Sequence, residues 1–266
     1  MSAVVIKQSH TRKYLNKITL IHHANKQRNS EDMMDVKFNF YSDTPPGKDP
    51  DSFSSTLRKY HQKLWSKKLP NGKKFTLDLD TPKLLHHSSE IEEFYLSSDA
   101  ITHTYKGVKK MSHIFQQLQK QEHDDFFDLC STIGAYIIFP SKRIDGKMTI
   151  NGARGTNRSI QDRFDLTLEC IKRFYSGIES PLYETFIRYK SFFELFEDFR
   201  GYIDFFLLND MVSKDYKEIV FWLPFNSFDY SPLPQTLTEY YSYKENVERF
   251  VKSRNARICK LHGETN

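Results

Sequence analysis

The spacing of apolar residues predicts a chain whose second half is mainly helical. Apolar positions recur every three or four residues from about residue 159 onward, which is the period of one helix face. Ser180 followed by Pro181 is a typical helix start, because serine caps free N–H groups and proline suits the first turn. We therefore predict helices at 159–176, 181–196, 198–212 and 235–260. The third is apolar nearly all round, so we expect it to be central and buried.

Strands are predicted mostly in the first half, where apolar and polar residues alternate or β-formers gather. Alternation places every second side chain on the same face of a sheet. These patterns predict strands at 36–41, 75–79, 93–97, 132–139, 147–150 and 218–225. Helical spacing in the same half predicts helices at 54–67, 107–121 and 123–130. The predicted class is α+β: a mainly antiparallel sheet packed on a helix-rich second half, with the last strand returning to the early sheet.

The composition fits a folded chain in a reducing compartment. With 266 residues, 38% of them hydrophobic, the chain can bury a sizeable core, which excludes global disorder. No apolar run is long enough for a membrane-spanning helix or a signal peptide. The three cysteines form no CxxC pair, which argues against a disulfide framework and a zinc finger. We therefore expect a cytoplasmic protein without a membrane partner.

The positive charge of the chain is concentrated at its start. Residues 1–32 hold six Lys and Arg against two acids, and the rest of the chain is nearly neutral. A near-neutral body gives no support for a face that binds duplex nucleic acid. We interpret residues 1–32 as a basic, solvated, partly disordered arm, and residues 33–266 as a single α+β domain. The arm could also touch nucleic acid or an anionic membrane.

The first candidate site is a glycine-containing segment before the predicted helix at 159–176. Well-known nucleotide, hydrolase and kinase motifs such as GxGxxG, GxxxxGK[ST] and GxSxG are absent from the chain. A helix start with glycines and arginines can still bind an anion, because free N–H groups and guanidinium groups face the ligand. The predicted ligand-binding residues are Asn151, Gly152, Arg154, Gly155, Asn157 and Arg158. The alternative is a structural connection whose arginines pair with acids of the chain.

The second candidate site is a polar stripe on the same predicted helix. Asp162, Asp165 and Glu169 fall on one side at helical spacing, together with Arg158. Three carboxylates could do acid–base work as catalytic residues or hold Mg²⁺. No His, Cys or Asp spacing is typical of a metal site, so no metal ligand is assigned and the cofactor stays unknown. The alternative is a solvated helix face with an ordinary Arg–Asp pair.

Two further features have structural interpretations. Arg200 and Asp204 stand four residues apart in strongly apolar sequence, which predicts a buried ion pair that holds helix register, with a role in lining a site as the alternative. His61 lies on an apolar helix face and is predicted to be a core histidine whose hydrogen bonds are satisfied.

Five motifs resemble a family of uncharacterised bacterial and prophage-associated proteins. They are DTPPGKDPD at 43–51, LRKYHQKLWSK at 57–67, LSSD at 96–99, DGKMTINGARG at 145–155 and DRFDLTLECI at 162–171. The resemblance covers roughly residues 35 to 258 and leaves the basic arm outside. It implies a bacterial cytoplasmic protein and assigns no activity.

The leading hypothesis is a protein that binds a phosphorylated or otherwise anionic ligand, a nucleotide or a nucleic-acid end. The stiff loop at 43–51 could join the predicted site, and any catalysis would act on a phosphoester or glycosidic bond. Prophage association would fit a phage-defence or toxin-like role. The alternative is a non-catalytic protein-interaction module with an unknown partner. A concave pocket where Arg154, Arg158 and an acid converge would favour the first hypothesis.

Overall fold

The computed structural model describes residues 34–79, 84–88 and 92–263. Val36–Ile258 form one compact unit, and the described end of the last helix, from Cys259, lies outside it. The predicted arm at 1–32 lies outside the described residues. No helix in the described part of the chain has the length and apolar character needed to cross a membrane.

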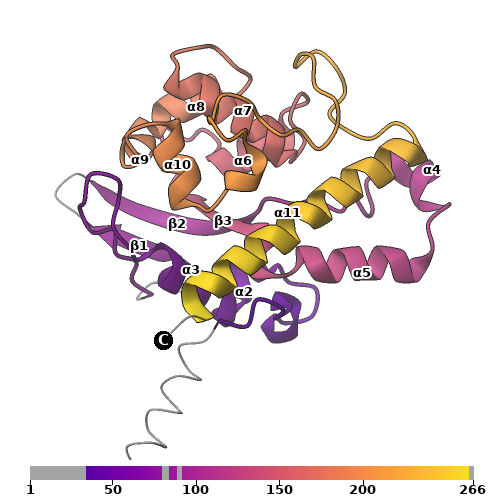
Figure 1. The fold of residues 1–266 in the computed structure, drawn as a ribbon, viewed down its shortest axis with the longest axis horizontal. Coiled ribbons are helices and arrows are strands. Elements are labelled where there is room, and N and C mark those ends of the chain that lie inside the picture. The colour runs from indigo at the N-terminus through magenta and orange to yellow at the C-terminus, as the bar shows by residue number, and fades with distance from the viewer. Residues whose placement is uncertain (1–33, 80–83, 89–91, 264–266) are drawn as a thin grey trace, which may run out of the picture. The chain divides into compact units, whose positions relative to one another are not determined.

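A three-stranded antiparallel sheet lies in the first half of the chain. Its strands, in the order β1-β2-β3, are Leu85–Ser88, Glu93–Ala100 and Tyr136–Pro140. The central strand β2 pairs with both neighbours, and every residue of β3 is buried. Figure 1 shows helices on both sides of β2 and β3, with α6 to α10 on one side and α2 and α3 on the other. The predicted α+β class is confirmed.

The helices of the first half are short except for two. They are η1 Phe40–Asp43, α2 Pro50–Phe53, α3 Ser55–Trp65, η2 Lys109–Met111, α4 Ser112–Phe115, α5 Lys120–Cys130 and η3 Ile133–Ala135. Both α2 and α3 pack on β2. The predicted helix at 54–67 is confirmed as α3, where Ser54 caps the start by accepting from the Leu57 amide.

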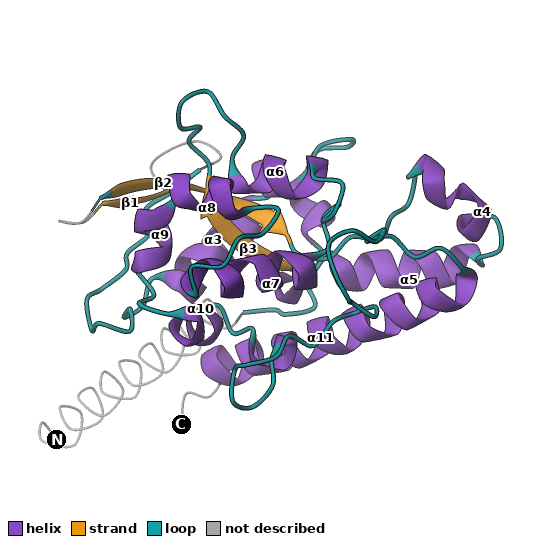
Figure 2. Cartoon of the chain, turned by 90° about the horizontal axis from the view of Figure 1, so that it is seen from above, coloured by secondary structure: helices purple, strands orange, loops and turns teal. Residues whose placement is uncertain are grey.

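The second half is helical, as its apolar spacing predicts. Its elements are α6 Ile150–Thr156, α7 Phe164–Tyr175, α8 Tyr183–Arg188, α9 Lys190–Glu194, α10 Phe199–Phe205, η4 Asn209–Met211 and α11 Leu237–Gly263. The long α11 runs beside α5 (Figure 2), and Lys244 of α11 forms an ion pair with Glu122 of α5. The helix predicted at 198–212 is shorter in the structure, because α10 ends at Phe205 and η4 follows after a turn. The rings of α10 are buried, with Tyr202 against Phe193 of α9, but Arg200 and Asp204 are exposed, so the expectation of a helix buried all round is wrong.

The buried Arg254 connects α11 to the sheet and to α10. Its guanidinium donates to the carbonyls of Gly134 and Tyr136 at 3.0 and 2.8 Å, and to that of Phe206 at 2.9 Å. Burial lowers the pKa of Arg254 to about 9. Three carbonyl groups from two segments thus replace the water that this cation loses on folding.

Several predicted strands are wrong, and local hydrogen bonds explain why. Residues 36–41 enter the 3₁₀ helix η1, because the Asn39 side chain accepts from the Tyr41 amide and closes a turn. Residues 75–79 and 218–225 form only isolated bridges, at Asp78 and Ile219. In the second of these segments the Trp222 amide donates to a side chain, Asp165, instead of to a partner strand. The predicted return of 218–225 to the sheet is therefore also wrong.

The segment around the first candidate site also differs from its prediction. Residues 150–156 form the helix α6 in place of a strand end and a loop, and α7 begins only at Phe164. Thr149 caps α6, which allows the helix to form despite its two glycines. Arg158 and Asp162 therefore lie in the connection between the helices, and the predicted stripe of four residues on one helix is wrong.

Candidate functional site

Arg154 of α6 lies in the middle of the candidate site and is enclosed by protein. It is 0% exposed, and its guanidinium packs on the rings of Phe139 and Phe164 at 5.9 and 5.4 Å from their centroids. Its Nε donates to the hydroxyl of Thr167 on α7 at 3.0 Å. A guanidinium in such surroundings needs a negative partner inside the protein. Arg154 therefore cannot reach out to clamp a ligand at the surface.

Asp99, near the end of β2, is the charge partner of Arg154. The two side chains form an ion pair. The Asn151 side-chain amide, with its nitrogen toward Asp99, donates to both carboxylate oxygens. Burial raises the pKa of Asp99 to about 6; Arg154 opposes the rise, and the charge of Asp162 adds to it. Asp99 is thus held by two donors and is mainly ionised at neutral pH.

Asp51 is half-buried, and its carboxyl group is close enough to sense the charge of Asp99. Asp49 caps α2 by accepting from the Asp51 amide at 3.1 Å, which places Asp51 in the first turn. Burial, then the charges of Asp99 and Asp49, raises the pKa of Asp51 to about 8, while the Ser98 hydroxyl and the Ala100 backbone lower it. Oδ1 of Asp51 is buried and has no hydrogen-bond partner among the described residues. At neutral pH Asp51 is therefore mostly a protonated acid, and one of its oxygens is buried without a hydrogen-bond partner among the described residues.

A chain of buried hydrogen bonds leads from α3 to the serine beside Asp99. The Trp65 indole donates to Nδ1 of His61 at 3.0 Å, and Nε2 of His61 lies 2.9 Å from the Ser98 hydroxyl. Because an indole can only donate, Nδ1 is the acceptor and Nε2 carries the proton. Burial lowers the pKa of His61 to about 3, so the ring is neutral. His61 is a satisfied core histidine, as predicted, and it orients the Ser98 hydroxyl.

Asp162 approaches the site through strained backbone. Gln161 and Asp162 have φ values of 42° and 61°, a left-handed conformation that non-glycine residues rarely adopt. The Asp162 carboxylate lies 3.2 Å from the place where a Cβ on Gly155 would stand, so a larger residue at 155 would make the carboxylate shift by a few tenths of an ångström. Burial lowers the pKa of His103, and the charge of the Asp162 carboxylate opposes this shift. We call Asp51, Asp99, Asn151, Arg154 and Asp162 the aspartate site.

The other two predicted catalytic acids have structural partners. Asp165 is 0% exposed and accepts from Nε of Arg163 at 2.7 Å and from the Trp222 amide at 2.8 Å. Glu169, one turn further along α7, pairs with Lys172 at 2.7 Å and with Arg173 at 2.8 Å. These contacts occupy both carboxylates. They hold α7 to its neighbours and leave neither carboxylate free for catalysis.

The remaining predicted ligand-binding residues belong to helix ends or to the surface. The Gly152 amide donates to the Thr149 cap at 3.3 Å. Asn157 ends α6, where its side chain donates to the Pro181 carbonyl at 3.2 Å and accepts from the Ser159 amide at 2.9 Å. Arg158 is exposed. The structure thus brings Asn151, Arg154, Gly155 and Asp162 together, and places Arg158 elsewhere on the surface.

Asp51 and Asp99 are the members of the site that the sequence analysis did not assign. Asp51 ends the proline-rich loop that was expected to join the site, and this was its only signal. Asp99 is an acid inside a segment of strand-forming residues, where a charge needs a partner. Neither pattern indicates which distant arginine supplies that partner.

The charge of the aspartate site disfavours an anionic ligand at its centre. Asp49, Asp99 and Asp162 surround the single cation Arg154, and that cation is already paired. Neither Arg154 nor Arg158 lines one of the three main cavities found among the described residues. In the same part of the chain, no group of three His, Cys, Asp or Glu side chains is placed to hold a metal ion. The arrangement suits proton transfer to and from a ligand without net negative charge.

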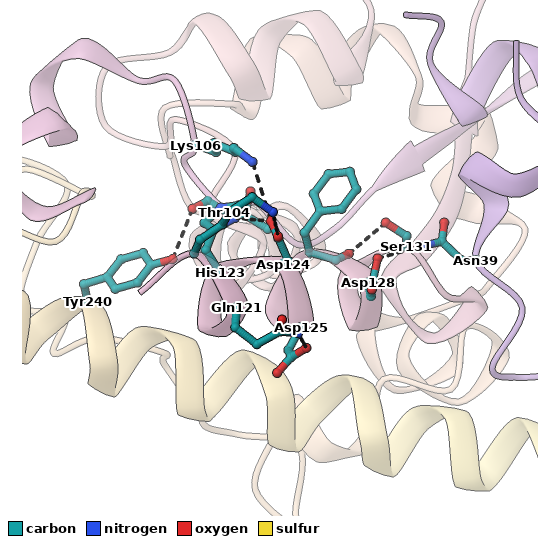
Figure 3. A network of polar contacts seen from close by, with 12 residues as sticks. Asn39, Thr104, Lys106, Gln121, His123, Asp124, Asp125, Asp128, Ser131 and Tyr240 are labelled. Atoms are coloured by element: carbon teal, nitrogen blue, oxygen red, sulfur yellow. Dashed lines mark hydrogen bonds and ion pairs between the residues drawn. The ribbon is translucent and has the colours of Figure 1, made fainter. Parts of the chain in front are cut away.

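A separate polar network lies along α5 (Figure 3). Asp124 pairs with Lys120 and, at 3.9 Å, with Lys106, and Asn39 donates to Asp128 at 3.0 Å. Both lysines are mostly exposed, Lys120 at 90% and Lys106 at 63%. Exposed pairs of this kind contribute little to stability. The network orders the surface of α5, and its charged groups satisfy one another.

We expect Asp51 to make the folded protein less stable as the pH rises. Its pKa of about 8 lies above the ordinary 3.8, so the folded form binds this proton more tightly than the unfolded form does. The stability that the Asp51 proton contributes is fully present below the pKa of Asp51 in the unfolded chain. It is lost as the pH rises through the pKa of about 8 in the folded protein. Asp51→Asn, which has no proton to lose, should be more stable than the native protein by about 1–2 kcal/mol near pH 8.5.

Urea unfolding at about pH 5 and about pH 8.5 measures this difference. Asp145→Asn is the matched control, because Asp145 is exposed in a turn and should leave the slope unchanged. If the free energy of unfolding changes equally with pH in Asp51→Asn and in the native protein, Asp51 is ordinarily ionised.

The fold and the site together define an α+β protein with a buried aspartate–arginine centre. The chain belongs to a family of unknown function, DUF6994, whose sequence profile matches residues 34–258. The resemblance to an uncharacterised family is confirmed at that level. Neither the curated proteins nor the solved structures contain a significant match to the chain.

Proposed function

We propose that the aspartate site is the acid–base centre of an enzyme that cleaves a glycosidic bond in a nucleotide or a related ligand. The observation that carries the proposal is the pair formed by Asp51, whose buried Oδ1 has no hydrogen-bond partner among the described residues, and Asp99, which Arg154 and Asn151 hold. Environments that push two carboxyl pKa values apart provide an acid and a base at the same pH. Glycosidases use such a pair of carboxyl groups.

The two acids would have different roles in this reaction. Asp51, protonated at neutral pH, gives its proton to the leaving group. Asp99, mainly ionised, stabilises the positive charge that develops on the sugar and takes a proton from the water that attacks the sugar carbon. Tyr41 lies near enough to sense the charges of Asp49 and Asp51. Because it is 42% exposed, its ring offers a flat surface to a sugar or a base. Phosphoester cleavage fits less well, because carboxylates repel the phosphate.

The anionic part of the ligand, if it is a nucleotide, would lie outside this centre. Arg158 supports this part of the proposal, because it is exposed and forms no ion pair with a carboxylate among the described residues. The resemblance of the motifs supports a bacterial, prophage-associated and cytoplasmic protein with a phage-defence or toxin-like role. That role is part of the proposal.

The test is base release from a panel of nucleosides, nucleotides and dinucleotides, followed by chromatography. Asp51→Asn should lower the rate at least about 100-fold, the usual effect of losing a general acid. The native rate should be highest between the pKa values of about 6 and about 8. Asp145→Asn should keep the native rate.

A complementary measurement is the thermal shift with the same panel. A ligand at 100 times its Kd should add about 2.7 kcal/mol to the free energy of unfolding. A folded protein that releases no base and shows no shift with any ligand would contradict the proposal. It would favour the non-catalytic interaction module.

A further inference from the structure

A cavity of about 470 Å³ lies where the turn after α3 meets α10. Its walls include Lys67, Lys68, Glu197, Asp198, Arg200 and Asp204. The cavity is within the size range of small-molecule sites. None of these residues belongs to the aspartate site, so a role for this cavity does not depend on the proposed function.

Lys67 holds its amine in unusual surroundings at this cavity. Nζ lies 5.1 Å from the ring centroid of Trp65 and 4.6 Å from that of Phe205, and it donates to the Phe205 carbonyl. The guanidinium of Arg254 packs on Trp65 as well, 5.7 Å from its ring centroid. Within the described part of the chain, no carboxylate lies within ion-pair distance of Lys67, whereas Lys120 and Lys172 have such partners.

Burial works against the charged amine, whereas the two rings and the carbonyl acceptor suit an ammonium group. Burial and the charge of Arg254 lower the pKa of Lys67 to about 8, and the charge of Asp204 opposes them. Asp204 is itself engaged, because it accepts from Asn209 at 2.6 Å and from the Tyr216 hydroxyl at 2.8 Å. A neutral lysine amine in contact with a cavity is a nucleophile.

The wall carries slightly more negative than positive charge once Lys67 is neutral. Lys68 and Arg200 then face three acids, Glu197, Asp198 and Asp204. The predicted buried ion pair of Arg200 and Asp204 is wrong: the side chains are 69% and 46% exposed, with 3.7 Å between Nε and Oδ2. An exposed pair leaves the cavity open to solvent and favours an uncharged ligand over an anion.

We propose that Lys67 is a nucleophilic amine that forms an imine with a small uncharged aldehyde or ketone bound in this cavity. The Nζ lone pair attacks the carbonyl carbon, and a proton moves from nitrogen to the oxygen to give a carbinolamine. Loss of that hydroxyl group as water leaves a C=N bond at Nζ. The overall reaction joins one amine and one carbonyl compound and releases one water, with no oxidant or reductant.

The experiment treats the full-length protein with glyceraldehyde near pH 7.5 and traps the imine with cyanoborohydride. Peptide mass spectrometry then compares Lys67 with its neighbour Lys68, which is exposed. Lys67 should be labelled at least about tenfold faster, because burial lowers its pKa to about 8 and its amine lies at the wall of the cavity. The rate at Lys67 should saturate with glyceraldehyde concentration, as binding in a cavity requires.

Two variants and one condition make the result specific. Asp204→Asn removes the acid that favours the protonated amine, so labelling of Lys67 should become faster. Lys67→Arg should lose the fast label while Lys68 keeps its slow one. In concentrated urea the two lysines should react equally. Labelling of Lys67 no faster than Lys68 in the folded protein, or a rate that stays linear in glyceraldehyde, would overturn the proposal.

Discussion

Arg154→Met is expected to destabilise the protein by about 3–5 kcal/mol, the usual cost of removing one partner of a buried ion pair. Arg154 is 0% exposed and neutralises Asp99, which is itself 9% exposed. Methionine fills much of the space between the rings of Phe139 and Phe164 but leaves a buried carboxylate without its cation. The measurement is urea unfolding followed by circular dichroism.

Arg158→Met is the control for the Arg154 substitution. Arg158 stands four residues later and is exposed, so its replacement should change stability by no more than about 0.5 kcal/mol. A double variant, Arg154→Met with Asp99→Leu, should recover part of the lost stability because no unpaired charge remains. A cost below about 1 kcal/mol for Arg154→Met alone would mean that Asp99 keeps a partner or a proton in its absence.

The helices of the second half were predictable because their signals are local. The apolar face of α7 and the aromatic surface of α10 repeat within a few turns of one helix, so no distant contact is needed to see them. The same holds for α3, whose serine cap stands directly before it. The start of α7 was missed because the φ values of Gln161 and Asp162 interrupt the helix without a glycine or a proline to mark the break.

The wrong strands share a different cause. Phe75 and Leu77 are both buried, as alternation requires, at 0% and 1% exposure. Alternation reports which side chains turn inward, and it does not report whether a partner strand is available. At 75–79 the only β pairing is the bridge between Asp78 and His86.

The aspartate site could be predicted only in part, because its charges come from three separate segments. Asn151 and Arg154 stand on α6 and were identified together, since glycines and arginine mark that segment. Asp99 comes from β2 and stands 55 residues before Arg154 in the sequence. One sequence cannot show that contact. The sequence therefore could not show that Arg154 forms its ion pair with Asp99.

The three acids predicted as one stripe should respond differently to amide substitution, and Asp165→Asn should have the largest effect. Asp165 neutralises Arg163, which is 2% exposed and also donates to the Pro232 carbonyl at 2.8 Å. The asparagine keeps the size of the side chain but leaves that guanidinium without its counter-charge. We expect a loss of about 3–5 kcal/mol in the free energy of unfolding.

Asp162→Asn and Glu169→Gln are the matched comparisons. Asparagine suits the left-handed backbone at 162, and the change removes a charge that raises the pKa of Asp99, so stability should be equal or slightly higher. Glu169 pairs with bases that are 25% and 30% exposed, so its amide should cost about 1 kcal/mol or less. Urea unfolding of the three variants at one pH gives the order of their losses in the free energy of unfolding. Equal losses at all three positions would show that Asp165 is solvated like its neighbours and that the Arg163 pair does not hold α7 to the segment around Trp222.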